Sequence, residues 1–268
     1  MKAHPCKIVV FDLDETVGHF AEIGIFWEAL EKFYGHNLFP DKFHEMLDLF
    51  PEFFRPDIFK MLDYIHQKRT CRKIIMYTNN QGDKSWLQML TSYIDKKLGY
   101  KVFDQVVAAY KVNGKPVEKK RTSHDKSLSD LIRCTDIPSK SEVLFIDDLY
   151  HPLMDQDTVH YINIKPYRFS LPYAEMARRY YTRVLGSGGS SGSSGGGSSG
   201  SEFEFVQYIV NSMRRYNYMV IEKSDLEIKT DKMVSKNLWS HLEEFLKPQK
   251  MKQTRKNRNK RVRTLRNK

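Results

Sequence analysis

The chain has 268 residues, with 44 Lys+Arg against 33 Asp+Glu, and a formal net charge of +11. The excess is local, because residues 247–268 hold eleven basic residues and no acid, which leaves 33 basic and 33 acidic residues in 1–246. Hydrophobic residues make up 40% of the chain and aromatic residues 13%, so global disorder is excluded. No apolar run approaches the roughly 20 residues of a membrane span, so we expect no membrane partner. The three well-separated cysteines indicate a reduced, intracellular protein without a disulfide framework.

Short β-branched runs alternate along the chain with amphipathic segments. Strands are predicted at residues 7–11, 73–77, 102–109, 142–146 and 159–164. Helices are predicted at residues 26–34, 55–67, 84–98, 125–134 (capped by Ser123), 173–185, 203–215 and 232–246. Residues 111–121 are predicted to form a charged loop. The alternation of strands and helices favours an α/β fold with a mainly parallel sheet.

A pure Gly/Ser run, GSGGSSGSSGGGSSGS, occupies residues 186–201 and is typical of an engineered linker. The predicted organisation is therefore a core over residues 1–185, this linker, a helical segment over 202–248 that packs on the core, and a disordered basic tail over 249–268.

Polar clusters follow three of the predicted strands directly. They are Asp12 and Asp14, then Thr78 and Asn79, then Asp147 and Asp148. In a parallel sheet, ligands bind at the carboxyl ends of the strands, so these clusters are expected to meet at one edge.

The clusters together favour phosphoryl transfer. Paired carboxylates repel each other unless a cation lies between them, and Mg²⁺ prefers such hard oxygen ligands. Thr78 offers a hydroxyl for a phosphate, and Lys126 is the lysine best placed to neutralise it. One carboxylate could then attack phosphorus while another transfers protons.

These motifs resemble those of the haloacid-dehalogenase superfamily of aspartate-dependent phosphatases. Within that superfamily, the chain is similar to the RNA polymerase II C-terminal-domain phosphatase family, also called NLI-interacting-factor-like. The segments that carry the resemblance are FDLDETVGHF (11–20), Arg55-Pro56, KIIMYT (73–78), Lys126–Ser129, VLFIDD (143–148) and LWSHLEEFL (238–246). The resemblance implies a Rossmann-like core. The stretch between Thr16 and Thr78 holds about 60 residues, so little or no cap is expected over that core.

The resemblance also implies roles for single residues. Asp12 would be the nucleophile and Asp14 the general acid and base, with Thr16 supporting them. Phosphate would be bound by Thr78, Asn79 and Lys126. The metal would be held by Asp12, Asp14 and Asp148, and Asp147 would orient the lysine or a water. The chain departs from the family in having Asn79-Asn80-Gln81 after the second strand and Asp-Asp instead of Asp-Asn after the fourth.

The expected function is a magnesium-dependent phosphomonoester hydrolase that acts on phosphoserine or phosphothreonine in a protein segment, because an open site admits a macromolecule. One alternative is a polynucleotide 3′-phosphatase, since Asp-Asp also occurs in that branch. A second is a catalytically silent module that binds nucleic acid or protein. The tail at residues 247–268 is expected to bind nucleic acid or an acidic protein, or to target the chain to the nucleus.

Overall fold

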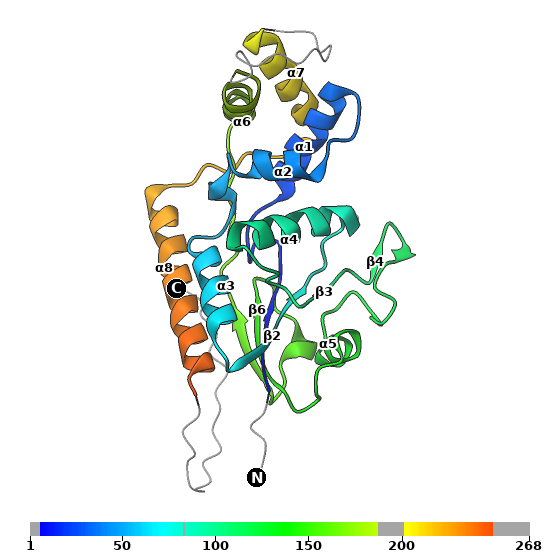
Figure 1. Ribbon diagram of the computed structural model, residues 1–268, viewed down its shortest axis with the longest axis vertical. Helices are drawn as coiled ribbons and strands as arrows, with labels where there is room; N and C mark the ends of the chain where they lie inside the picture. The colour runs from blue at the N-terminus through cyan, green and yellow to red at the C-terminus, as the bar shows by residue number, and fades with distance from the viewer. Residues whose placement is uncertain (1–5, 83, 187–200, 249–268) are drawn as a thin grey trace, which may run out of the picture. The chain divides into compact units, whose positions relative to one another are not determined.

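The computed structural model describes residues 6–82, 84–186 and 201–248 (Figure 1). Most of the Gly/Ser run and the basic tail at 249–268 lie outside these residues, so the expectations for both stay predictions. By internal contacts the chain divides into two compact units. The first comprises residues 1–18, 54–167 and 225–268, and the second comprises residues 19–53 and 168–224.

The first unit is built on a five-stranded parallel sheet with the order β3-β2-β1-β6-β7. Its strands are β1 (Lys7–Phe11), β2 (Cys71–Tyr77), β3 (Gln105–Val107), β6 (Glu142–Asp147) and β7 (Val159–Asn163). Its helices are α3 (Ile58–Gln67), α4 (Lys84–Leu98), α5 (Leu128–Thr135), the 3₁₀ turn η2 (Pro152–Met154) and α8 (Asp225–Leu246). A two-stranded hairpin, β4 (Lys111–Val112) and β5 (Lys115–Pro116), completes it. The predicted α/β fold with a parallel sheet is confirmed.

The central strand β1 is buried along its whole length and alternates its side chains between the two faces of the sheet. Ile8 and Val10 join a core with Leu131 of α5 and Met154 of η2. The opposite face is covered by α8, where the Phe245 ring lies 5.2 Å from the ring of His160. Helix α8 also packs beside α3, with Trp239 and Tyr64 in ring contact (Figure 1). Because both faces are covered, the strands can be apolar almost throughout.

The order of the strands locates the part of the sheet where ligands are expected. The chain builds β1, β2 and β3 to one side and then returns to place β6 on the other side of β1. This reversal makes a topological switch point at the carboxyl ends of β1 and β6. Asp12 follows β1 directly, and β6 ends at Asp147.

The second unit is helical. It contains α1 (Ala21–Tyr34), α2 (Pro40–Leu47), the 3₁₀ turn η1 (Pro51–Phe53), α6 (Tyr173–Tyr180), a π-helical turn η3 (Tyr181–Leu185) and α7 (Glu202–Arg214). Aromatic side chains hold it together, with Phe26 of α1 against Tyr180 of α6, and Phe33 of α1 against Phe205 of α7.

This unit changes the predicted organisation. Residues 19–53 and 168–186, which were assigned to the core, pack instead with residues 201–224. In the predicted segment 202–248, α8 belongs to the α/β unit, whereas α7 does not. Periodicity marks an apolar face on a helix but does not say which helix will cover it. The length of the stretch between Thr16 and Thr78 therefore underestimates the helical unit, because residues 168–224 also belong to it.

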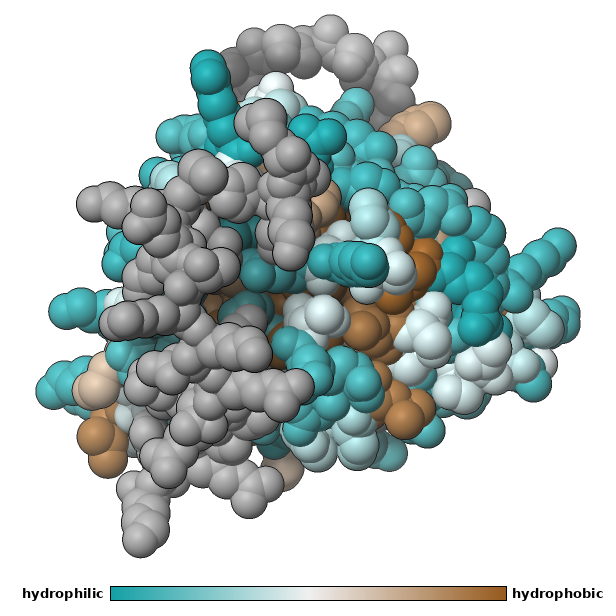
Figure 2. Space-filling model, turned by 90° about the horizontal axis from the view of Figure 1, so that it is seen from below, coloured by the Kyte–Doolittle hydropathy of each residue, from teal (hydrophilic) through white to brown (hydrophobic). Residues whose placement is uncertain are grey.

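No helix within the described residues is long and apolar enough to cross a membrane. The face shown in Figure 2 is mainly hydrophilic, with a smaller hydrophobic area among the polar residues.

Candidate active site at the carboxyl edge of the sheet

Asp12 lies where β1 ends, between β2 and β6. Its backbone N–H donates to the carbonyl of Ile146 at 2.9 Å, which continues the sheet by one residue. Phe11 and Leu13 on either side of it are fully buried. The Asp12 side chain is itself 8% exposed, so its carboxylate is held in a largely desolvated position.

Lys126 is the cation at the centre of the site. Its Nζ donates to Oδ1 of Asp12 at 2.5 Å and to Oδ2 of Asp147 at 2.7 Å. The ammonium also lies over the rings of Tyr77 and Phe145, at 5.7 and 5.9 Å from their centroids. A lysine that is 2% exposed stays charged only when such partners replace its water. Lys126 therefore joins the ends of β1 and β6 electrostatically.

The start of α5 explains how Lys126 is positioned. Ser127 has extended backbone angles and caps the helix, accepting at its Oγ from the backbone N–H of Asp130 at 3.1 Å. Ser123, the predicted cap, lies outside the helix, and α5 begins at Leu128 and not at residue 125. The lysine thus precedes the helix on extended chain, and its side chain reaches across to the strand ends.

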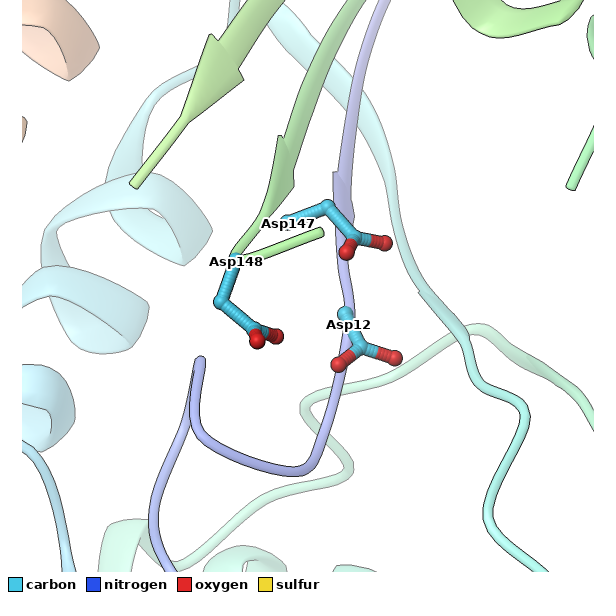
Figure 3. A group of neighbouring side chains, drawn as sticks. All are labelled: Asp12, Asp147 and Asp148. Carbon is cyan, nitrogen blue, oxygen red and sulfur yellow. The ribbon is translucent and has the colours of Figure 1, made fainter. Parts of the chain in front are cut away.

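Asp148 completes a group of three carboxylates. It is bound to Thr16 twice, since the Thr16 hydroxyl donates to Oδ1 at 3.2 Å and accepts from the Asp148 backbone N–H at 3.1 Å. Ligand oxygens of Asp12, Asp147 and Asp148 all lie within 4.8 Å of one another. Figure 3 shows these carboxylates converging from the ends of two neighbouring strands.

Burial and mutual repulsion shift the pKa values of these acids. Burial raises the pKa of Asp12 to about 8, although the attraction of Lys126 opposes the shift. Burial, together with the charges of Asp147 and Glu15, raises the pKa of Asp148 to about 6. For Asp147 burial is outweighed by Lys126 and by His151, whose Nε2 lies 3.4 Å from Oδ2, and its pKa is lowered. One lysine thus does not offset two buried carboxylates and a half-buried one, and the group has the charge and the hard oxygen donors that suit a divalent cation.

Asp14 is not a member of this group, although its charge contributes to the raised pKa of Asp12. Its Oδ2 accepts from the side-chain amide of Asn80 at 2.7 Å. The predicted metal ligands were Asp12, Asp14 and Asp148, whereas the three-carboxylate group contains Asp147 and not Asp14. Asp14 lies two residues beyond Asp12, in a turn that is closed by hydrogen bonds from Val17 and Gly18 to Leu13.

Thr78 follows β2 and is buried. Its backbone N–H donates to the carbonyl of Val107 at 3.0 Å, so that N–H extends the pairing of β2 with β3 and is not available to a ligand. Its hydroxyl accepts from the backbone N–H of Asn80 at 3.0 Å. The Asn79 amide donates to the carbonyl of His124 at 3.0 Å, so it holds the loop that carries Lys126, and its role toward phosphate stays a prediction.

Three polar residues around the site were not assigned a site role from the sequence. Asn80 orients Asp14, as described above. Arg55 is 1% exposed and donates to the backbone carbonyls of Glu15, Thr16 and Lys165 at 2.6 to 2.9 Å. It thereby fixes the turn that carries the acids. The Arg-Pro step at residues 55–56 was the available signal.

Arg121 is the third. Its guanidinium donates to the carbonyls of Thr78, Ala108 and His124 at 2.9 to 3.1 Å. The end of β2 and the loop before Lys126 are therefore tied to one buried side chain. It belonged to a segment predicted as a charged loop, and no spacing marks one basic residue of such a segment as buried.

Searches of protein-family models, of curated proteins and of solved structures gave no match to this chain.

Proposed function

We propose that the chain is a magnesium-dependent phosphomonoester hydrolase that works through an aspartyl-phosphate on Asp12. The observation that carries the proposal is the buried contact of Lys126 with Asp12 and Asp147, beside Asp148, at the switch point of the sheet. The resemblance of the motifs to the haloacid-dehalogenase phosphatases supports the same function.

The proposed reaction has two displacements. An oxygen of the Asp12 carboxylate attacks phosphorus, and the bond between phosphorus and the alcohol oxygen of the substrate breaks. Asp14 donates a proton to that leaving oxygen, so the alcohol departs neutral. Asp14 then accepts a proton from water as the water oxygen attacks phosphorus. The bond to Asp12 breaks, and inorganic phosphate is released.

The remaining residues would bind and orient. Lys126 and the hydroxyl of Thr78 face the phosphate, and the lysine neutralises charge on its oxygens. Asp147 holds the lysine in place, and Asn80 holds Asp14. Asp148 and Asp12 are the expected metal ligands. A bound Mg²⁺ would supply the positive charge that keeps the neighbouring carboxylates ionised and offsets that of the phosphate.

The proposed substrate is a phosphorylated serine or threonine in a polypeptide. The test measures phosphate release from phosphoserine and phosphothreonine peptides, from a sugar phosphate and from a 3′-phosphorylated oligonucleotide, with Mg²⁺ and with a chelator. We expect Mg²⁺-dependent hydrolysis of the peptides and no hydrolysis by Asp12→Asn. A clear preference for the sugar phosphate would refute the choice of substrate.

The 3′-phosphatase is the second candidate. The observation that favours it is the pair Asp147 and Asp148, since both carboxylates belong to the same group. Hydrolysis of the oligonucleotide at a higher kcat/KM than of any peptide would establish it instead. If wild type and Asp12→Asn are equally inactive on all four substrates, the chain is a silent binding module.

A further inference from the structure

The hairpin of β4 and β5 concentrates positive charge in a short segment of the chain. Residues 111–120 contain four lysines, Lys111, Lys115, Lys119 and Lys120, and one acid, Glu118, which leaves a local net charge of +3. By contrast, residues 1–246 as a whole contain 33 basic and 33 acidic residues. The charge of the hairpin is therefore a local feature of the chain.

A tight turn forms the tip of this hairpin. Asn113 and Gly114 both have positive φ, 49° and 76°, and they close a two-residue turn between the strands. The stem is joined by hydrogen bonds from Val117 to Tyr110 and from Glu118 to Ala109. The turn and the stem therefore define the backbone that carries the lysines.

The lysines are available for binding. Lys115, Lys119 and Lys120 are exposed. Within the described part of the chain, Lys115 and Lys119 have no ion pair, and Lys120 approaches Asp136 at 3.6 Å, where both side chains are exposed. Lys111 lies over the ring of Tyr110 at 4.9 Å. Removing Lys115 or Lys119 therefore breaks no salt bridge.

Both ends of the segment are attached to the candidate active site. At its start, Val107 accepts from the backbone N–H of Thr78. At its end, Arg121 donates to the Thr78 carbonyl, and the chain continues to Lys126. Figure 1 shows the hairpin projecting from the β3 side of the α/β unit. Four residues separate Val107 from Val112, the partner of Lys115, so even a fully extended chain would place Lys115 at most about 17 Å from the level of Thr78.

We propose that this hairpin binds a second anionic group of the substrate while the first phosphate occupies the site beside Lys126. The inference rests on the proposed function and specifies its substrate as a polypeptide segment with a second phosphorylated or acidic residue. An extended polypeptide spans about 3.3–3.6 Å per residue, so a reach of at most about 17 Å places this second group within about five residues of the phosphoresidue that is hydrolysed.

A polypeptide fits the hairpin better than a nucleic acid. Proteins that bind single-stranded nucleic acid combine a basic groove with aromatic rings on which bases stack. The hairpin segment has one aromatic residue, Tyr110, whose ring is covered by Lys111 and contacted edge-on by His124 at 5.6 Å. Its exposed groups are the ammonium groups of lysines, which bind phosphate and carboxylate groups as point charges.

The test compares kcat/KM for three phosphoserine peptides, one singly phosphorylated, one with a second phosphoserine four residues before it, and one with the second four residues after it. The full chain is used with Mg²⁺ at low salt. We expect one doubly phosphorylated peptide to be preferred by about threefold to tenfold over the singly phosphorylated peptide, the size given by two exposed charge contacts. In Lys115→Ala/Lys119→Ala the preference should fall below twofold, with the singly phosphorylated peptide unaffected.

The matched control is Lys232→Ala/Lys236→Ala, which removes two exposed lysines from α8 of the same unit and should keep the preference. Thermal unfolding of both variants checks that the fold is intact. Equal hydrolysis of all three peptides by the wild type overturns the hairpin proposal but leaves the phosphatase proposal standing, whereas no hydrolysis of any peptide overturns both. If the proposal holds, a 3′-phosphorylated oligonucleotide is not hydrolysed faster than every peptide. If it is, and if Lys115→Ala/Lys119→Ala loses that faster hydrolysis, the hairpin binds nucleic acid and the proposal is overturned.

Discussion

Replacing Lys126 by methionine would remove the cation that holds Asp12 and Asp147 while keeping an unbranched side chain of similar length. The lysine is 2% exposed and makes two short contacts to carboxylates that are themselves buried. Removing one partner of a buried ion pair typically costs about 3–5 kcal/mol, because the remaining charge is left desolvated. We expect a loss of this size in the free energy of unfolding at pH 8, measured by urea denaturation without divalent cations.

The same substitution should make stability depend strongly on pH. Without the lysine, the two carboxylates keep their protons more tightly in the folded chain than in the unfolded chain, where an aspartate has a pKa near 4. A group with a raised folded pKa contributes its full stability below the unfolded pKa and loses it as pH rises through the folded pKa. The difference in the free energy of unfolding between the wild type and Lys126→Met should therefore be small near pH 4 and grow toward pH 8.

Two controls test whether the loss of stability comes from the unpaired carboxylates. Asp12→Asn combined with Lys126→Met removes one of the stranded charges and should recover part of the loss, giving a coupling energy in a double-mutant cycle. Mg²⁺ should also stabilise Lys126→Met, because the carboxylates that it leaves unpaired are the expected ligands. A variant as stable as the wild type at pH 8 without Mg²⁺ would refute the view that Lys126 compensates the buried acids.

Three further predictions concern single contacts. Burial raises the pKa of Glu22 to about 7 from 4.5, so the wild type should lose stability as pH rises from about 4.5 to 7. Glu22→Gln should therefore be about 1–3 kcal/mol more stable than the wild type at pH 8 and no more stable at pH 4, and thermal unfolding at the two pH values checks this. Ser127→Ala removes the cap that accepts from Asp130 and should cost about 1 kcal/mol in urea unfolding, whereas an unchanged midpoint would contradict the capping role. Asn80→Ala should lower kcat about tenfold to a hundredfold with little change in KM, because Asp14 loses the amide that orients it, and steady-state kinetics in which KM alone changes would argue against that role.

The sheet and its acidic edge could be predicted from the sequence for a simple physical reason. The buried strands are short apolar runs that end abruptly in polar residues, and a parallel sheet gathers those ends at one edge. Asp12 could be placed at that edge by its strand, and Lys126, 114 residues away, was predicted to act at the same site as the lysine that neutralises the phosphate. The helix after Lys126 was placed too early, although Ser127 and Asp130 have the spacing of a cap and its first-turn acid.

Other features depend on contacts that local patterns do not encode. Two asparagines follow Thr78, and the turn geometry determines that Asn80, and not Asn79, reaches Asp14. Helix α2 was missed because it is short, although Pro40 at its start is a usual helix signal. The helical unit joins α1 to α6 and α7 from more than a hundred residues later, and amphipathic periodicity cannot identify such partners.

The central claim is that Asp12 accepts the phosphoryl group. The most direct measurement is acid quenching during turnover of a phosphopeptide with Mg²⁺, followed by mass spectrometry of the peptide that contains Asp12. The account predicts one added phosphoryl group on Asp12 in the wild type and none in Asp12→Asn. Steady hydrolysis without any phosphorylated Asp12, or hydrolysis that survives in Asp12→Asn, would contradict it.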